Sequence, residues 1–418
     1  MSSLTKYQKD KLLKSDTFCT LPWIHMHGWA TGKAYPCCVA ESKYPVGSLK
    51  ENTLEELFNS EDMKEMRRNM LADRPCKQCT RCYEHEESGF ISYRESMNRE
   101  FASHVDLVNK TEDDGTMPEF KMRYLDIRFS NLCNFKCRSC GDMFSSTWAK
   151  ELKEHGDWGT SPTVIYAGKY KSDMWEQMIP HIDTFEQIYF AGGEPLLMQE
   201  HYELLNNLIK LGKTDIPLVY NSNFSTLIYK QTDVLDLWKQ FDSVAIGASL
   251  DASYERGELM RSGTVWKDIV KNRERQLKEC PHIDFYVSST LSIMNSFNIV
   301  DFHREWVDLG LIEPKDWNIN ILLSDDYYRL DVLPTKLKEQ VKEKYEDHIR
   351  WLQVRDPLTR ATNGFKSAIR FMEATDNSHL IPRFNKVNYV LDKRRAETFY
   401  DVFPELGEMR DDNNSANT

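Results

Sequence analysis

The sequence predicts an α/β protein, in which a partial barrel of strand-helix units follows a small N-terminal module of mixed helix and strand. Three observations support this fold class. Six β-rich apolar runs alternate with amphipathic spans after residue 120, nine of the ten cysteines fall in three groups within the first 140 residues, and a hairpin-and-helix pattern occupies the start of the chain. With 418 residues, 40% of them hydrophobic, the chain has enough material for two or three domains.

The N-terminal part begins with a polar extension over residues 1–18. Residues 18–41 follow as short apolar strands with turns at Gly28 and Gly32. A helical period then starts at Leu49 and continues through the methionines that end at Met70. We therefore predict a small module over residues 19–107, and the polar, breaker-rich stretch 108–119 connects it to the next part.

The strand-helix part extends over residues 120–323. Its predicted strands are Met122–Phe129, Gln187–Ala191, Leu218–Ser222, Val244–Ser249, Phe285–Leu291 and Trp317–Leu323. The predicted helices lie near 142–154, 200–211, 231–240, 265–279 and 299–309. Strands that alternate with helices form βα units with a parallel sheet, either curved into a partial barrel or left open. Ligands of such sheets bind at the carboxyl ends of the strands.

The remaining residues, 324–418, are predicted to form a helical extension. An amphipathic helix is expected at about 335–353, and the last ten residues, MRDDNNSANT, are expected to be disordered because almost all of them are polar. No residue of this extension identifies a substrate contact.

Composition limits the partners of the chain. The net charge of −11 provides no general basic field for nucleic acid or an anionic membrane. No apolar run is long enough for a membrane helix, and the first residues lack the apolar core of a signal peptide. We therefore expect a cytoplasmic protein with reduced thiols, so the clustering of its cysteines indicates metal binding.

One cysteine group follows the first predicted strand of the barrel in the segment DIRFSNLCNFKCRSC. Cys133, Cys137 and Cys140 have the spacing C-x3-C-x2-C. Three thiolates are one fewer than the four that complete an iron-sulfur cluster or a structural zinc site, so one metal position stays open. A zinc knuckle with its fourth ligand elsewhere is the alternative.

With this motif, residues 120–323 resemble the radical S-adenosylmethionine (radical SAM) superfamily. The resemblance implies that Cys133, Cys137 and Cys140 bind a four-iron four-sulfur (4Fe-4S) cluster whose open iron is chelated by S-adenosyl-L-methionine (SAM). Ser139 stands where the family often has an aromatic residue.

Further strand ends carry the family's other SAM contacts. FAGGEPLL at 190–197 matches the GGEP motif, which gives Gly192, Gly193 and Glu194 a role in binding the SAM amino group. The resemblance also assigns SAM contacts to Asn223 after the third strand, to Ser249 after the fourth, and to Arg261, whose guanidinium suits a carboxylate.

The N-terminal cysteines form two groups, Cys19 with Cys37 and Cys38, and the run C76-K-Q-C79-T-R-C82. Pairs from distant turns can build a four-thiolate site, either for a cluster or for zinc as in a zinc ribbon. The pattern C-x17-C with GSLKENTLEELFNSE and MRRNMLADRPCKQC resembles the auxiliary-cluster module called SPASM or, when shortened, twitch.

In most radical SAM proteins this module follows the barrel, whereas here it precedes it. The segment C-x2-C-Y-x2-E-x2-G-x2-S-x-R at 79–94 resembles a subgroup with an N-terminal twitch module. That match implies Cys19, Cys37, Cys79 and Cys82 as ligands of a second 4Fe-4S cluster, with Cys38 and Cys76 as candidates to replace a neighbour. Cys280 is expected to be a buried apolar residue.

The resemblance implies an oxidoreductase or maturase that cleaves SAM reductively to a 5′-deoxyadenosyl radical, which abstracts hydrogen from a substrate. The expected outcome is net oxidation or cross-linking of a ribosomal peptide, with a small molecule such as a sugar or nucleotide as the alternative. Flavodoxin or ferredoxin is the expected electron donor. A non-catalytic zinc protein is the hypothesis from a different class. The sequence does not identify the substrate, the fate of its radical or the oligomeric state.

Overall fold

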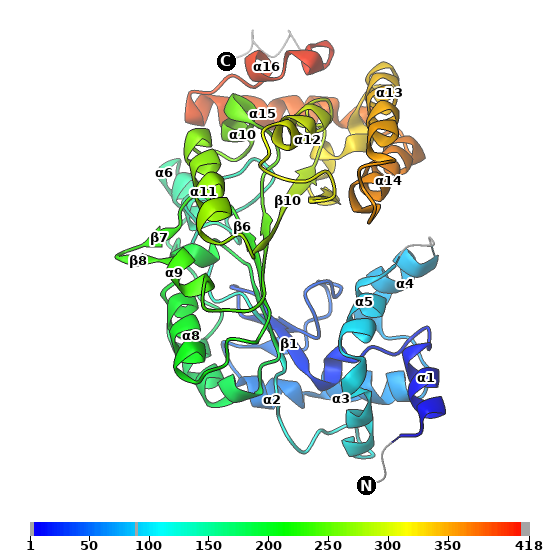
Figure 1. The fold of residues 1–418 in the computed structure, drawn as a ribbon. Coiled ribbons are helices and arrows are strands. Elements are labelled where there is room, and N and C mark those ends of the chain that lie inside the picture. The colour runs from blue at the N-terminus through cyan, green and yellow to red at the C-terminus, as the bar shows by residue number, and fades with distance from the viewer. Residues whose placement is uncertain (1–3, 88–90, 411–418) are drawn as a thin grey trace. The chain divides into compact units, whose positions relative to one another are not determined.

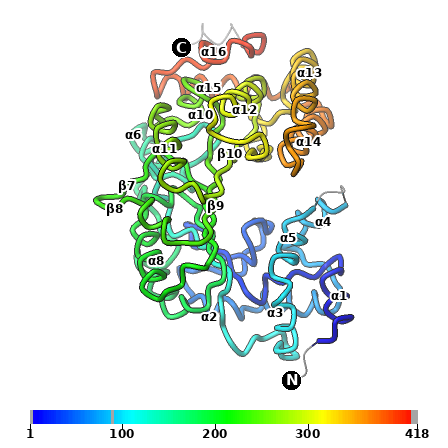
Figure 2. Tube along the Cα trace, in the orientation of Figure 1, coloured from blue at the N-terminus to red at the C-terminus, as the bar shows by residue number. Residues whose placement is uncertain are grey.

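The structure is a computed structural model that describes residues 4–87 and 91–410. Contacts between residues divide the chain into two compact units. The first comprises residues 1–132, 142–219 and 240–242, and the second comprises residues 133–141, 220–239 and 243–418. Figure 1 labels elements of both units, and Figure 2 shows the Cα trace of the chain. The three-cysteine loop belongs to the second unit, although its flanking segments belong to the first.

The sheet of the first unit joins the N-terminal hairpin to strands from the strand-helix part. Its order is β3-β2-β1-β4-β5. The strands are β1 (His25–Gly28), β2 (Lys33–Tyr35), β3 (Gly47–Ser48), β4 (Tyr124–Ile127) and β5 (Gln187–Phe190). β1 pairs antiparallel with β2, which pairs antiparallel with β3, whereas β1 is parallel to β4 and β4 is parallel to β5. The hairpin therefore extends the same sheet.

The two faces of β1 and β4 differ in chemistry because successive side chains alternate. Met26 and Leu125 are buried on one face, and His25, His27 and Asp126 are buried on the other. Each histidine donates a hydrogen bond from Nδ1 to a backbone carbonyl of β4. His25 donates to Tyr124 O at 2.8 Å, and His27 donates to Asp126 O at 2.9 Å. The contacts of the two histidines therefore stabilise the junction of hairpin and sheet.

Eight α-helices accompany this sheet among the described residues of the first unit. They are α1 (Lys6–Leu13), α2 (Leu54–Phe58), α3 (Glu61–Leu71), α4 (Thr80–Glu87), α5 (Tyr93–Glu100), α6 (Ser146–Glu154), α7 (Asp173–Met178) and α8 (Gln199–Lys210). Short 3-10 segments are η1 (Leu21–Trp23), η2 (Lys77–Cys79), η3 (Ala102–Lys110), η4 (Ile179–Thr184) and η5 (Pro195–Leu197). Serine and threonine caps begin several of the helices, for example Thr53 at α2 and Ser92 at α5, both in capping boxes.

The second unit contains a parallel sheet of β9 (Val244–Ala248), β10 (Asp284–Leu291) and β11 (Trp317–Ile321). β6 (Leu218–Ser222) is divided between the units, and β7 (Ile228–Tyr229) pairs with β8 (Thr232–Asp233). Helices of this unit within the same strand-helix part are α9 (Val234–Trp238), α10 (Tyr254–Met260), α11 (Trp266–Glu279) and α12 (Ile299–Asp308). Trp306 and Trp317 are fully buried in its core.

The C-terminal extension contributes α13 (Thr335–Leu352), α14 (Arg360–Ala374), α15 (Ile381–Arg395) and α16 (Phe399–Val402), with 3-10 segments η6 (Asp326–Tyr328), η7 (Leu330–Val332), η8 (Ser378–Leu380) and η9 (Pro404–Met409). Figure 1 shows α15 and α16 beside α10. The prediction of a disordered tail from Met409 onward is wrong at that residue, because Met409 is buried in η9. Residues 411–418 lie outside the described residues.

The parallel pairs confirm the predicted α/β class, and each of the six predicted strands overlaps an observed one. Curvature into a partial barrel stays a prediction, as do the module boundaries at residues 107 and 120. No helix among the described residues is both long and apolar enough to cross a bilayer.

Arg67 provides a test of the N-terminal packing. Its buried guanidinium donates to the carbonyl oxygens of Pro22 at 3.0 Å, Phe58 at 2.6 Å and Gly115 at 3.1 Å. We expect Arg67→Met to lower the free energy of unfolding by about 3 kcal/mol, because each buried carbonyl left without a donor costs about 1–3 kcal/mol. Urea unfolding followed by circular dichroism measures the loss. Arg68→Met, at the next and more exposed position, is the control, and equal stability of the two variants would contradict this role.

Candidate metal centres

Four thiols of the N-terminal part lie close together. Cys19 precedes η1, Cys37 follows β2, Cys79 ends η2 and Cys82 lies in α4. Burial and the neighbouring thiols Cys79 and Cys82 raise the pKa of Cys19. Burial, then Cys38, and then the other three thiols of the group raise the pKa of Cys37. The four predicted auxiliary ligands therefore come within electrostatic range of one another from four separate segments.

The two other N-terminal cysteines have different surroundings. Burial and the nearby Asp126 carboxylate raise the pKa of Cys38 to about 12, and the Cys38 thiol also interacts with Tyr93. The Cys76 thiol interacts with that of Cys79, and the Cys38 thiol interacts with that of Cys37. The Cys76 backbone N–H donates to the Tyr83 hydroxyl at 3.1 Å. Each of the two candidates to replace a ligand therefore lies beside a predicted ligand, Cys38 beside Cys37 and Cys76 beside Cys79.

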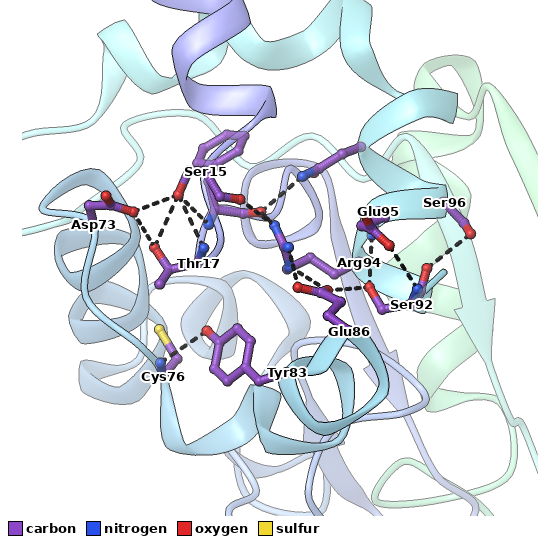
Figure 3. A network of polar contacts seen from close by, with 12 residues as sticks. Ser15, Thr17, Asp73, Cys76, Tyr83, Glu86, Ser92, Arg94, Glu95 and Ser96 are labelled. Atoms are coloured by element: carbon purple, nitrogen blue, oxygen red, sulfur yellow. Dashed lines mark hydrogen bonds and ion pairs between the residues drawn. The ribbon is translucent and has the colours of Figure 1, made fainter. Parts of the chain in front are cut away.

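A buried arginine holds the segment that leads to Cys19. Arg94 donates to the carbonyl oxygens of Ser15 at 2.7 Å and Phe18 at 2.8 Å, and its Nε donates to Glu86 in α4 at 2.9 Å (Figure 3). Glu86 belongs to the helix that carries Cys82. Arg94 therefore links the backbone next to one predicted ligand to the helix of another.

These contacts give the motif at 79–94 a physical role. The residues named in the motif include Glu86, Ser92 and Arg94, and the Ser92 hydroxyl also donates to Glu86. Asp73 accepts from the hydroxyls of Ser15 at 2.7 Å and Thr17 at 2.9 Å, and so holds the same segment from its other side (Figure 3). Sequence reasoning quoted the motif but did not find these roles. The motif's Gly89 lies outside the described residues.

The three-cysteine loop of the second unit is held through its backbone. The N–H of Lys136 donates to Ser262 O at 2.9 Å, and the N–H of Arg138 donates to Met260 O at 2.8 Å. Within the loop, the N–H of Phe135 donates to the Cys133 sulfur at 3.4 Å, and the N–H of Cys140 donates to Cys137 O at 3.1 Å. Hydrogen bonds to the backbone of segment 260–262 thus hold the predicted cluster loop in place.

Burial raises the pKa of two thiols in this loop, and one nearby positive charge acts in the opposite direction. Burial raises the pKa of Cys137, and the Arg261 guanidinium opposes that rise. Burial and Cys137 raise the pKa of Cys140 to about 12. Arg261 itself donates from Nε and Nη2 to the two carboxylate oxygens of Asp251, at 2.8 and 3.0 Å. This predicted SAM contact is therefore oriented by Asp251, a partner that sequence reasoning did not assign.

Asn223 and Ser249 lie in the same unit as the loop. The Asn223 amide donates to Asn134 Oδ1 at 2.9 Å, one residue after Cys133. Ser249 follows β9, and its backbone N–H donates to Ser222 O at 2.7 Å. The structure thus joins Asn223 directly to the cysteine loop and places Ser249 beside the residue that precedes Asn223.

The predicted GGEP element follows β5 in the first unit. Gly192 has a φ of 121°, which favours glycine, and a Cβ at Gly193 would lie 2.2 Å from Leu132 O. The N–H of Glu194 donates to the same oxygen at 2.7 Å, and the Glu194 carboxylate accepts from Leu196 N at 3.1 Å. This turn therefore packs on the backbone of the residue immediately before Cys133.

The donor sets suit iron-sulfur clusters. Among the described residues, no three His, Cys, Asp or Glu side chains are close enough to hold a single metal ion. Thiolates are the usual protein ligands of iron-sulfur clusters. Groups of three and four buried or half-buried thiols fit the cluster hypothesis, and the assignment of individual ligands stays a prediction.

Comparison with protein families supports this reading for the N-terminal part. Residues 19–83 match the model of SPASM, described as an iron-sulfur cluster-binding domain. Residues 19–83 are therefore similar to an iron-sulfur cluster-binding domain, and four of the predicted ligands lie within them. Comparison with curated proteins found no match.

Solved structures whose titles name bound AdoMet are among those similar to the chain. The structure titled native anSMEcpe with bound AdoMet has 17% identity, a TM-score of 0.40, and coverage of 55% of this chain and 61% of that one. Native anSMEcpe with bound AdoMet and Cp18Cys peptide has 15% identity, a TM-score of 0.34, and coverage of 53% and 59%. TYW1 with a lysine-pyruvate adduct has 14% identity, a TM-score of 0.28, and coverage of 56% and 72%. The chain thus spans less than two thirds of the anSMEcpe chains.

Cys79 and Cys38 form a matched pair for testing the auxiliary ligands. Cys79→Ala removes a thiol from the group of four, so we expect it to lose the iron of one cluster after anaerobic reconstitution. Cys38→Ala removes a thiol that lies next to Cys37 and also interacts with Asp126 and Tyr93. Because Cys38 is not one of the four predicted ligands, we expect the iron content of this variant to equal that of the wild type. Iron and sulfide analysis measures both. Equal losses in the two variants would show that Cys38 is a ligand.

Gly193 tests the contact between the GGEP turn and Leu132. Gly193→Ala forces a methyl group against the Leu132 carbonyl oxygen, and overpacking of this kind costs about 1–3 kcal/mol. We expect a lower unfolding midpoint in urea and weaker SAM binding by calorimetry. Gly407→Ala is the control, because a Cβ there meets no atom within 4 Å. If Gly193→Ala bound SAM with unchanged affinity, the GGEP turn would have no role in SAM binding.

Proposed function

We propose that the chain is a radical SAM enzyme with one auxiliary 4Fe-4S cluster. In this proposal Cys133, Cys137 and Cys140 hold the catalytic cluster, and Cys19, Cys37, Cys79 and Cys82 hold the auxiliary cluster. The observation that carries the proposal is the difference in thiol number between the two groups. Three thiolates leave one iron without a protein ligand, whereas four complete a cluster.

In this proposal SAM is held by the residues that the family resemblance assigns to it. Gly192, Gly193 and Glu194 provide backbone oxygens and a carboxylate for its amino group, and Arg261 provides a guanidinium for its carboxylate. Asn223 and Ser249 supply polar groups for the remainder of the molecule. When bound beside a reduced cluster, SAM supplies a 5′-deoxyadenosyl radical that abstracts hydrogen from the substrate.

The local surroundings of Arg261 support its role as a fixed anchor. Asp251 binds the guanidinium in a bidentate pair and also accepts from the Thr290 backbone N–H at 2.8 Å. A guanidinium fixed by two hydrogen bonds loses little conformational entropy when it binds a second carboxylate, because folding has already restricted its orientation. Asp251 is thus a positioning residue in this proposal.

The auxiliary cluster is proposed to accept the electron that remains after hydrogen abstraction, which gives a net oxidation or a cross-link. Four thiolates leave no open iron for direct substrate coordination. The proposed substrate is a ribosomally made peptide, because modules of the SPASM type often accompany peptide modification. A sugar or nucleotide is the alternative substrate. We propose a cytoplasmic location and a flavodoxin or ferredoxin as electron donor.

The test of the enzyme class is SAM cleavage by the reconstituted protein. With dithionite as reductant, we expect methionine and 5′-deoxyadenosine in liquid chromatography with mass detection. Replacement of Cys133, Cys137 and Cys140 by Ala should remove this cleavage, because the SAM-binding iron is lost, and should leave the auxiliary cluster in place. A rate below one hundredth of the wild type is the expected scale, as for loss of an essential cofactor.

The matched control is Cys280→Ala, since Cys280 is buried apart from both groups and interacts with Leu235 O. That variant should cleave SAM at the wild-type rate. Cleavage that persists in the triple variant would refute the radical SAM proposal. A wild-type protein that is colourless and binds stoichiometric zinc would favour the non-catalytic zinc protein instead.

A further inference from the structure

Arg138 is the one arginine of the three-cysteine loop, and its side chain points away from solvent. It lies between Cys137 and Cys140 in the sequence, and its side chain is fully buried. An arginine so buried requires partners for its charge and its donors. These partners come from the C-terminal extension, more than 240 residues further along the chain.

Three side chains accept hydrogen bonds from the Arg138 guanidinium. Nη1 donates to Asn388 Oδ1 at 2.6 Å, and Nη2 donates to Asp392 and to Glu397, the latter at 2.7 Å. Asn388 and Asp392 belong to α15. The guanidinium also lies over the Phe399 ring, at 5.6 Å from its centroid. All of these groups belong to the second unit.

The acceptors are themselves fixed. Asp392 accepts from the Phe399 backbone N–H at 2.8 Å, and Asn388 Oδ1 accepts from the Tyr328 hydroxyl at 3.2 Å. Ala396 ends α15 with a φ of 52°, a left-handed conformation that is unfavourable for a residue with a Cβ. This turn is maintained although it is strained, and it brings Glu397 back toward the loop.

The Glu397 carboxylate binds both Arg138 of the loop and Ser262, which supports the loop. One carboxylate oxygen accepts from Arg138 and the other accepts from the Ser262 hydroxyl at 3.0 Å. Ser262 is also the residue whose carbonyl oxygen accepts from the Lys136 backbone N–H. The Glu397 carboxylate therefore binds both the cysteine loop and segment 260–262, whose carbonyl oxygens accept hydrogen bonds from that loop.

We propose that Arg138 is a positioning residue which, through Asn388, Asp392 and Glu397, holds the three-cysteine loop in its cluster-binding conformation, so that the C-terminal extension forms part of the catalytic-cluster site. This inference rests on the proposed function for the identity of the cluster. It assigns a role to a region in which the sequence indicates none.

The physical basis is the cost of ordering the loop. A loop with three thiol ligands has many conformations, and only a few present all three sulfurs to one cluster. Charge-assisted hydrogen bonds from a buried guanidinium restrict those conformations before the cluster is inserted. Loss of the restraint should then affect cluster assembly and SAM binding more than it affects the fold.

Glu397→Gln is the mildest test of this link. The Glu397 side chain is 20% exposed, so the neutral amide is tolerated while the charge-assisted bond is weakened. Hydrogen exchange with mass detection on the full-length reconstituted protein should show segment 133–141 exchanging about tenfold faster, which corresponds to about 1.4 kcal/mol of local stability. The SAM-induced change in the electron paramagnetic resonance signal of the reduced protein should also decrease.

Glu405→Gln is the matched control. Glu405 pairs with Arg256 at 2.9 Å, belongs to the same extension and is 18% exposed, but it has no contact with Arg138. It should leave both measurements unchanged. The proposal is overturned if Glu397→Gln behaves as the wild type in both measurements, or if Glu405→Gln shows the same effects.

Substitutions of Arg138 itself complete the test. Arg138→Met should assemble only the auxiliary cluster, and Arg138→Lys, which retains the charge, should recover part of the second cluster. If Arg138→Met does not fold, the exchange measurement on Glu397→Gln decides the question. A wild-type protein with iron for one cluster and no response to SAM would refute the proposed function, whereas the exchange rates would still report on the link between loop and extension.

Discussion

The number of thiolates that the fold delivers to each metal centre is the constraint on which the account of this protein depends. A group of four thiols satisfies a cluster, and a group of three leaves one iron for an exogenous ligand. The four N-terminal thiols lie within electrostatic range of one another, and the three later thiols lie on one loop of the second unit. One kind of ligand thus supports two different chemical tasks.

Both groups are held by buried arginines that bind no substrate in this account. Arg94 fixes the backbone that leads to Cys19, and Arg138 fixes the loop between Cys137 and Cys140. Arginine suits this work because its planar guanidinium bonds several acceptors at once and stays charged when buried. In each case the arginine also pairs with carboxylates, which compensates its charge.

The sequence predicted the strands and most helices of the strand-helix part because their apolar periods are regular. The β6 bounds Leu218–Ser222 agree with the prediction, and α13 differs from its predicted span by one residue. Parallel pairing of β1 with β4 was not predicted, because pairing between distant strands leaves no local pattern. The packed end of the extension was missed at Met409 for the same reason, since its burial depends on distant residues.

The candidate cysteines were found from spacing alone, because ligands that share a loop also share a short sequence motif. Their supporting residues were not found in this way. Arg138 looks like a surface charge in the sequence, and its partners Asn388, Asp392 and Glu397 form no motif with it. Glu86 and Arg94 were visible within a quoted motif, but only the structure shows that they hold the Cys19 segment. Supporting contacts of this kind are long-range, so a local pattern does not reveal them.

Electron paramagnetic resonance of the reduced, reconstituted wild-type chain, with and without SAM, tests the central claim most directly. If three thiolates leave one iron open, SAM will shift the signal of one cluster and leave the signal of the other unchanged. Signals from both clusters that do not respond to SAM, or a single cluster in the whole chain, would contradict the account.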